Sequence, residues 1–408
     1  MRKRGVVITG VGAVSPYGWG LLPLLDGLRD GRCCLTLVPD NQLLVPRVKT
    51  RGAVPPFDEK SIPREYRRTM PRMGIMGFMA AAEALAGAGI TPDTPLSASC
   101  RDIGTCIAST VASTETLEDF FSVYFGPRGI NAARSTTFFK IMGHAVASSL
   151  CAAFGLSGRS LSPAAACAGS LQALGLAYES IAFGRSEWML AGGVEEFHPL
   201  LAATFDKIEA ASHHPDPEYA SRPFDMDRNG MVCSEGAGMF LLESADHAYA
   251  RGAPALAEIN GFSTGVSPDG IVFPDSRAIE NCMREALMDA GIEPWEADLI
   301  SAHATATETG DIAEGQAIER VFGPTVPVNS LKGYLGHCMA ASGALELMAA
   351  VHAAREGFIH GTRNCATIDP RCGNIMLEAA HREKKVRYIV KNSFGLGGVN
   401  ACLVITVQ

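Results

Sequence analysis

A cysteine among small residues is the first candidate for chemistry in this chain. Cys167 lies in "SPAAACAGS", residues 162–170, between a strand-like run over residues 160–162 and a helical pattern that begins near Ala168 or Gly169. A thiol at the start of a helix faces the positive end of the helix dipole and free backbone N–H groups, which favour the nucleophilic thiolate. Its small neighbours are expected to leave room for a bulky acyl group. The alternative is an inert packing cysteine, and position alone does not decide between the two.

Two histidines can serve as the partners that a thiolate nucleophile needs. His303 lies in "SAHATATETGD", residues 301–311, and His337 lies in "NSLKGYLGHCMAASGA", residues 329–344. Each follows a strand-like run and precedes a helix, and α/β proteins place ligands in loops at the carboxyl ends of parallel strands. Either histidine alone is more often structural. A cysteine and two histidines at three such strand ends favour nucleophilic catalysis.

The elements that must position these residues form an alternating pattern of strands and helices. Apolar runs such as "GVVITG", "DIGTCIAST", "EWMLAGG" and "GMFLLE" are typical of buried strands, and helical patterns lie over residues 74–88 and 170–182. This alternation predicts an α/β fold with largely parallel sheets covered by helices.

One segment of the chain occurs twice. "EALAGAGITP", residues 83–92, returns as "EALMDAGIEP", residues 285–294, and in both places an aspartate and an apolar strand follow. Glycine suits the position after a helix end, and proline blocks extension of the helix. The repeat and the matching order of elements predict an internal duplication, with one half over residues 1–252 and the other over residues 253–408.

Composition excludes several classes of protein. Hydrophobic residues make up 47% and charged residues 19% of the chain, as in a globular protein, and the net charge of −8 argues against general nucleic-acid binding. The twelve cysteines are scattered without a CxxC pair, which favours reduced thiols in the cytoplasm over disulfides or a metal site. We expect no membrane span, because no apolar run reaches about 18 residues. Dinucleotide and P-loop fingerprints are also missing, since Ser15 stands where GxGxxG needs glycine.

One local basic stretch stands out against the negative net charge. It reads "EKSIPREYRRTMPRM", residues 59–73, and is either a solvated helix surface or a docking site for an acidic partner. Its basic residues are Lys60, Arg64, Arg67, Arg68 and Arg72.

Longer blocks around these residues resemble the β-ketoacyl-acyl-carrier-protein synthases of the elongating, Cys-His-His type, in the thiolase-fold superfamily. The blocks are "VVITGVGAVSPYG", "ACAGS", "MLAGGVEE", "SRPFDMDRNGMVCSEGAGMFLLE", "AHATATETGD", "KGYLGHCMAASGA" and "NSFGLGGVNACLVI", in this order along essentially the whole chain. The resemblance implies a thiolase-like five-layered α-β-α-β-α fold of two duplicated halves. It also implies an acyltransferase that extends a fatty-acid or polyketide chain by decarboxylative Claisen condensation with malonyl-acyl carrier protein.

The resemblance implies a role for each of the three candidate residues. Cys167 would take the acyl group as a thioester from the phosphopantetheine arm of an acyl carrier protein. His303 and His337 would promote decarboxylation of the malonyl extender and stabilise the enolate, which attacks the thioester. Neutral imidazoles can donate hydrogen bonds to an enolate oxygen near pH 7. No metal or redox cofactor is expected, because loss of CO₂ generates the carbanion.

Supporting roles follow from the same resemblance. The backbone N–H groups of Cys167 and Phe394 would form an oxyanion hole, and Phe394 would also gate the site. Lys332 and Glu314 would form a charged pair that organises the histidines. Thr305 and Thr307 would hydrogen-bond the pantetheine arm, and the basic stretch would dock the acidic carrier protein.

Three alternatives and two further details bear on this interpretation. A thiolase would carry a second cysteine in the C-terminal glycine loop, which here reads "NSFGLGG", and an initiating synthase would have asparagine at position 337. A tunnel-shaping, chain-length-factor-like subunit would lack the active cysteine. Ala304 stands where the family usually has glycine, so we expect a slightly altered turn. "STTFFKIMGHAVASSL" and "FHPLLAATFDKIEAASHH" resemble synthases of bacterial polyene and aryl-polyene pathways, which implies either a homodimer or a heterodimer.

Overall fold

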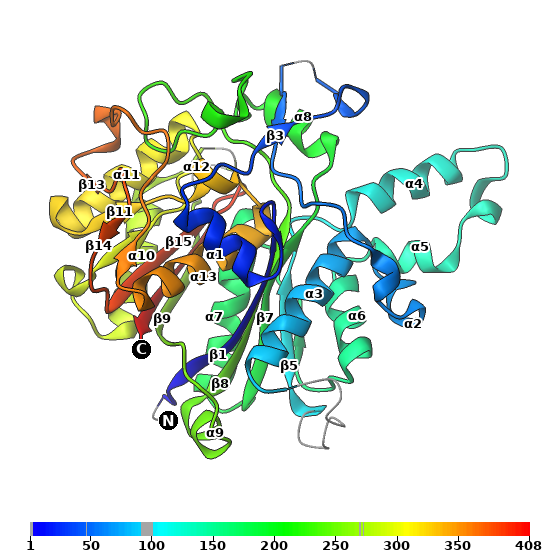
Figure 1. Ribbon diagram of the computed structural model, residues 1–408, viewed down its shortest axis with the longest axis horizontal. Helices are drawn as coiled ribbons and strands as arrows, with labels where there is room; N and C mark the ends of the chain where they lie inside the picture. Colours follow the sequence, from blue (N-terminus) through cyan, green and yellow to red (C-terminus); the bar gives the residue numbers. More distant parts are fainter. Residues whose placement is uncertain (1–2, 46, 91–100, 269–270, 272) are drawn as a thin grey trace.

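One large sheet runs through the molecule (Figure 1). The structure is a computed structural model, and it describes residues 3–45, 47–90, 101–268, 271 and 273–408. The large sheet has 12 strands, with β2 paired to β1 and the others in the order β13-β11-β10-β15-β16-β9-β1-β8-β7-β5-β6. Its strands are β1 (Val6–Ser15), β2 (Gly18–Trp19), β5 (Gly104–Ala108), β6 (Ser160–Leu161), β7 (Trp188–Glu195), β8 (Gly236–Ser244), β9 (Ala257–Val266), β10 (Leu299–Ser301), β11 (Pro327–Asn329), β13 (Met376–Leu377), β15 (Tyr388–Phe394) and β16 (Val399–Val407). Two small sheets pair β3 (Thr36–Leu37) with β4 (Thr50–Arg51) and β12 (Phe358–Ile359) with β14 (Arg382–Glu383).

The sheet repeats its own order outward from the centre. On one side the order is β1, β8, β7, β5 and β6, and on the other it is β9, β16, β15, β10 and β11. Both series begin with two antiparallel pairings and continue with two parallel ones. Strands β1 and β9 pair antiparallel and join the two series. This is the arrangement that an internal duplication predicts.

Helices divide the molecule into five layers. Helices α3 (Arg72–Gly87) and α6 (Ala145–Phe154) pack on the outer face of the first series, and α10 (Ser276–Ala290) and α11 (Glu308–Phe322) on that of the second. Helices α7 (Gly169–Ala182) and α13 (Ser342–Arg355) contact each other and strands of both series, so they form the middle layer. The five-layered α-β-α-β-α fold predicted from the sequence is therefore confirmed.

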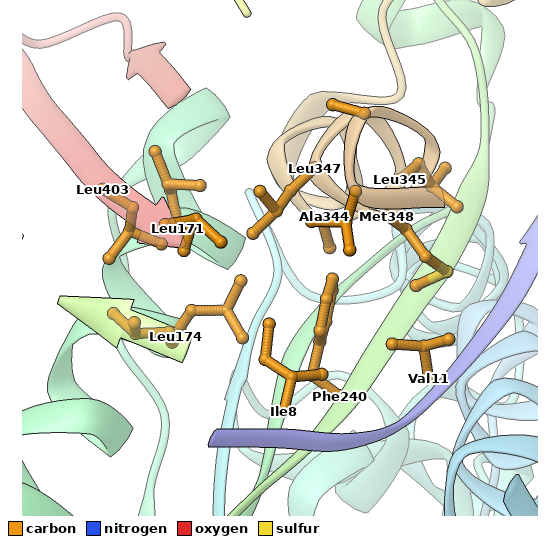
Figure 2. Packing of buried hydrophobic residues seen from close by; sticks show 14 of the residues in the cluster. Ile8, Val11, Leu171, Leu174, Phe240, Ala344, Leu345, Leu347, Met348 and Leu403 are labelled. Carbon is orange, nitrogen blue, oxygen red and sulfur yellow. The ribbon is translucent and has the colours of Figure 1, made fainter. Parts of the chain in front are cut away.

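The middle layer holds the largest apolar core. Figure 2 shows Leu174 of α7 and Leu347 of α13 beside Phe240 of β8 and Leu403 of β16. Burial of such side chains stabilises the fold by about 1.5–3 kcal/mol each. The core fixes both central helices, and the amino-terminal ends of these helices carry the residues discussed below.

Glycines let the outer helices approach the sheet closely at equivalent places. A Cβ atom on Gly10 of β1 would lie 2.0 Å from the Ala84 carbonyl oxygen of α3. A Cβ atom on Gly261 of β9 would lie 2.2 Å from the Ala286 carbonyl oxygen of α10. Ala84 and Ala286 are the same position of the repeated "EAL", so the repeat in the sequence is a repeat of helix packing. Residues 91 and 92 of the first copy lie outside the described residues.

The remaining helices lie around this framework. They are α1 (Leu21–Arg29), α2 (Arg64–Arg67), α4 (Thr114–Tyr124), α5 (Ser135–Lys140), α8 (Pro199–Lys207), α9 (Ala245–Ala250) and α12 (Lys332–Leu335). Helices α4 and α5 project from the body of the molecule (Figure 1). Among the described residues, no helix is both long and apolar enough to cross a membrane.

Candidate active site

Cys167 lies on a strained turn at the start of a central helix. The 3₁₀ turn Ala166–Ala168 precedes α7, and Ala166 has a φ of 45°, which is uncommon for a residue other than glycine. Such strain persists only where the surrounding structure enforces it, and it is concentrated at functional sites. The predicted position of the thiol at a helix start is correct.

The state of this thiol differs from the expectation. Burial raises the pKa of Cys167 to about 11, although the backbone N–H of Leu396 and the charge of Lys332 lower it. Desolvation therefore outweighs the helix terminus, and the resting thiol is protonated near neutral pH. The thiolate has to form as the acyl group is taken up.

The small residues around Cys167 permit close packing against a second turn. Within residues 162–170, only Cys167 lines the adjoining cavity. A Cβ atom on Gly169 would lie 3.0 Å from the Cβ of Ala108 and 3.2 Å from that of Ala340. Ala340 belongs to the 3₁₀ turn Met339–Ala341, which precedes α13 as the cysteine turn precedes α7. The absence of a side chain at Gly169 therefore makes room for this second turn, and the expectation that the small residues leave room for an acyl group stays a prediction.

The two predicted histidines lie together beside the same cavity. The rings of His303 and His337 have centroids 5.2 Å apart and an interplanar angle of 80°, and the ring of Phe394 lies 5.9 Å from that of His303. His337 Nδ1 lies 2.9 Å from the hydroxyl of Ser342, the first residue of α13. Its Nε2 has no hydrogen-bond partner within the described part of the chain, which leaves this atom for a ligand.

Both imidazoles are neutral at physiological pH. Burial lowers the pKa of each well below its usual value, and the charges of Lys332 and Lys391 lower it further. The neighbouring His337 adds to the effect on His303. Neutral imidazoles can donate one hydrogen bond each without being strong acids.

Glu314 holds the backbone at His303. Its carboxylate, on α11, accepts the N–H of His303 at 2.8 Å and the N–H of Ala304 at 2.6 Å. The side-chain amide of Asn392 donates to the same carboxylate at 3.0 Å. Burial raises the pKa of Glu314, while these N–H groups oppose the shift. Ala304 has no positive φ, so the turn does not need the glycine that the family usually has there.

The predicted ion pair between Lys332 and Glu314 is wrong. Lys332 pairs with Glu346 of α13, at 2.5 Å, and the other carboxylate oxygen of Glu346 lies 2.7 Å from Lys391 Nζ. All three side chains are buried. Sequence reasoning missed Glu346 and Lys391, although a charged residue inside the apolar runs "ALELMAAV" and "YIVKNSF" was an available signal.

The cavity joins both halves of the chain. It has a volume of about 270 Å³ and is lined by Cys167 and Phe205 from the first half and by residues of the second half that include His303 and His337. Thr305, Thr307, Phe394 and Glu314 also line it. The predicted catalytic and pantetheine-binding residues therefore converge, apart from Lys332, which does not line the cavity but whose charge acts on both histidines. The hydroxyls of Thr305 and Thr307 lie 3.0 Å apart. Within the described residues, no cluster of side chains suits a metal ion.

The five basic residues predicted to dock a partner are not equivalent. Lys60, Arg64 and Arg68 are exposed and Arg67 is half-buried. Arg72 is half-buried, lies 2.6 Å from the buried carboxylate of Glu235 and also contacts the Val54 carbonyl, so its charge is already paired within the chain. None of the five lines the cavity.

Comparison with known proteins identifies the family. A family model described as "Beta-ketoacyl synthase, N-terminal domain" matches residues 3–248, and "Beta-ketoacyl synthase, C-terminal domain" matches residues 256–366. The chain belongs to the β-ketoacyl synthase family. It is therefore an acyltransferase that forms β-ketoacyl products by condensation. The predicted resemblance to β-ketoacyl synthases, the predicted acyltransferase activity and the predicted fold are confirmed.

Curated relatives of this β-ketoacyl synthase match it along nearly their whole length. "Nodulation protein E" of Rhizobium sp. (strain N33) is 33% identical over 407 residues, which is 98% of each chain. "3-oxoacyl-[acyl-carrier-protein] synthase 1" of Escherichia coli (strain K12) is 32% identical over 409 residues, again 98% of each chain.

Solved structures agree with the fold. A "Beta-ketoacyl synthase from Burkholderia phymatum STM815" has a TM-score of 0.94 at 32% identity, and "The ishigamide ketosynthase/chain length factor" has a TM-score of 0.91 at 29% identity. A third structure, "AntDE:AntF (apo): type II PKS acyl-carrier protein in complex with its ketosynthase bound to the hexaketide", has a TM-score of 0.88 at 28% identity. All three cover 100% of both chains.

Proposed function

We propose that this β-ketoacyl synthase joins an acyl group held on Cys167 to a malonyl extender, and that both substrates arrive on the phosphopantetheine arm of an acyl carrier protein. The observation that carries the proposal is the convergence of Cys167, His303 and His337 on one cavity, although they come from different halves of the chain. This cavity combines a nucleophile with two neutral hydrogen-bond donors.

The first step transfers the acyl group. The Cys167 sulfur attacks the thioester carbonyl of the incoming acyl group, its proton passes to the departing pantetheine sulfur, and the carrier thiol leaves. Thiolate is both a good nucleophile and a good leaving group, which suits a thioester intermediate. The N–H of Leu396 interacts with the sulfur, so the loop after Phe394 is well placed to stabilise developing negative charge.

The second step forms the new carbon–carbon bond. The malonyl group loses CO₂, and the electrons of the broken bond form an enolate whose oxygen accepts hydrogen bonds from His303 and His337. The enolate carbon then attacks the Cys167 thioester and releases the thiolate, which takes up a proton from the solvent. The reaction balances without a metal or a redox cofactor, so we propose that none takes part. The oxyanion hole of Cys167 and Phe394 stays a prediction.

Residues that line the cavity are suited to bind the pantetheine arm of the carrier protein. Thr305 and Thr307 present hydroxyls along the wall and suit the amide groups of pantetheine. Phe394 lines the same cavity and its ring lies 5.9 Å from that of His303, where movement of the glycine-rich loop after it would open or close the site.

The partner proposed for the basic stretch is an acidic acyl carrier protein. Lys60, Arg64 and Arg68 are the exposed cations that can meet it, with Arg67 beside them, whereas Arg72 is withdrawn from this role by Glu235. A solved relative is described in complex with an acyl carrier protein. Because the net charge is −8, docking of an acidic partner needs such a local patch.

The quaternary structure and the pathway are further proposals. We propose that the chain works as a dimer, with a copy of itself or with a chain-length-factor-like subunit, because α4 and α5 project from the body and carry exposed Phe121, Phe125 and Phe138. The polyene or aryl-polyene pathway and the cytoplasmic location stay predictions. A tunnel-shaping role without condensing activity is not favoured, since such subunits lack the active cysteine.

A test of the function uses the purified protein with a panel of acyl carrier protein thioesters. We expect mass spectrometry to detect an acyl group on Cys167 and, after addition of malonyl-acyl carrier protein, a β-ketoacyl product two carbons longer. Cys167→Ala should abolish both signals and keep the fold. Cys106→Ala, which removes another buried thiol of the same half, is the matched control. Full elongation by Cys167→Ala would overturn the proposal.

A further inference from the structure

Lys391 is a buried cation close to the backbone of His303, and it has no role in the condensation mechanism described above. It lies in the middle of β15, and its side chain has an exposed fraction of 0%. Its ammonium contacts Glu346 at 2.7 Å and the carbonyl of Asn392 at 2.8 Å. It also donates to the carbonyls of Ser301 and Ala302, at 3.2 and 3.3 Å.

These contacts hold one side of the segment that carries His303. Lys391 binds the carbonyls of the two residues before His303, while Glu314 binds the N–H groups of His303 and of the residue after it. Asn392, the next residue of β15, donates to Glu314. Two adjacent residues of one strand therefore fix the His303 backbone from both sides, one directly and one through a carboxylate.

The buried lysines next to the histidines do not each have a carboxylate of their own. Glu346 is shared by Lys332 and Lys391, so two buried ammonium groups meet one carboxylate. Burying an ammonium costs several kcal/mol even when it is paired, and an apolar side chain at position 391 would avoid that cost. A contribution to folding stability therefore does not explain a lysine at position 391. An effect of its positive charge on the neighbouring residues can explain it.

We propose that Lys391 is a positioning residue of the condensation: it fixes the backbone that carries His303 and places a positive charge beside that backbone. The inference rests on the proposed function of this site and extends it. It explains how two imidazoles stay available as hydrogen-bond donors to an enolate instead of becoming imidazolium groups that would protonate its carbon.

The surrounding groups agree with this role. Burial is the largest cause of the lowered pKa of both histidines, and the charges of Lys332 and Lys391 add to it. Glu314 and Glu346 supply the opposing negative charge, and Cys402 is a neutral neighbour with a raised pKa. Since Lys391 lowers the pKa of both imidazoles, its removal should raise them.

The test compares Lys391→Met, which removes charge and hydrogen bonds, with Lys391→Gln, which removes the charge and keeps a donor. Lys384→Met is the matched control, because Lys384 forms its ion pair with Asp298 at the opposite end of β10. Acylation of Cys167 and decarboxylation of malonyl-acyl carrier protein are followed separately between pH 5.5 and pH 8.5. Titration of ¹³C-labelled histidine rings by NMR gives a readout that does not depend on activity.

Both Lys391 variants should decarboxylate malonyl-acyl carrier protein more slowly than the wild type at the acidic end of this pH range. We expect the acid limb of decarboxylation to move to higher pH, with about a tenfold loss at a pH on that limb for each pH unit of movement and with acylation of Cys167 unchanged. The same shift should appear in the titration of His303 and His337, and Lys384→Met should match the wild type.

Three results would overturn the inference. They are superimposable pH profiles, a loss that is equal at every pH and in both half-reactions, and failure of both Lys391 variants to fold, which would make the residue structural. A wild-type protein that acylates no cysteine and forms no β-ketoacyl product would instead refute the proposed function itself, so the two failures are distinguishable.

Discussion

Replacing Glu314 by glutamine tests how tightly the His303 segment must be held. In the structure, Oε1 accepts the N–H of His303 and the amide of Asn392, while Oε2 accepts the N–H of Ala304. A glutamine has one oxygen and one NH₂ group. If its oxygen takes the first position, the N–H of Ala304 faces another donor, and in the reverse orientation two donors lose their acceptor.

The magnitude follows from this count. Each buried donor left without an acceptor costs about 1–3 kcal/mol, so Glu314→Gln should lower the free energy of unfolding by about 1–3 kcal/mol in its better orientation. Removal of a buried negative charge offsets part of this loss, because burial already disfavours the ionised form of Glu314. Relaxation of the turn would displace the His303 ring, and a displacement of about 1 Å can cost about a hundredfold in rate.

The assay separates the two half-reactions. Glu314→Gln should acylate Cys167 at the wild-type rate, because Cys167 is held by α7, and should decarboxylate malonyl-acyl carrier protein about a hundredfold more slowly. Glu319→Gln is the control, since Glu319 is an exposed carboxylate on the same helix. Wild-type decarboxylation by Glu314→Gln would refute the reasoning, and so would an equal loss in both half-reactions.

Two further predictions concern the thiol and the docking surface. Alkylation of Cys167 by iodoacetamide should rise about tenfold per pH unit from pH 7 to pH 10 without a plateau, because burial raises its pKa to about 11. A plateau below pH 8 would show a preformed thiolate. Arg64→Glu combined with Arg68→Glu should raise the KM for acyl carrier protein substrates and leave kcat unchanged, with KM for a short pantetheine thioester as the control. An unchanged carrier KM would remove the patch from the docking surface.

The fold and the position of Cys167 at a helix start could be predicted from sequence because their signals are local or repeated. The repeat at residues 83–92 and 285–294 corresponds to two helices that pack on equivalent glycines. The position of Cys167 followed from a strand and a helix that are adjacent in the chain. Such features depend on a short stretch of residues, and their physical meaning does not require knowledge of distant contacts.

The parts that failed depend on which distant side chains meet. Lys332 pairs with Glu346 instead of Glu314, and this choice depends on the packing of α13 between strands of both halves. Arg72 belongs to the basic stretch in the sequence, yet in the structure it forms an ion pair with the buried Glu235. The protonated state of Cys167 likewise reflects burial by segments far away in the chain, which no pattern around "ACAGS" contains.

The duplication itself accounts for the asymmetry of the site. Two equivalent turns precede α7 and α13, each with one residue at a φ of 45°, Ala166 in the first and Met339 in the second. The position after it is Cys167 in one turn and Ala340 in the other. Because Ala340 packs against Gly169, a larger side chain there would push apart the two helix ends that meet in the middle layer. Ala340 does not line the cavity, and the second turn contributes to the site through His337, which lies just before it and lines the same cavity as Cys167.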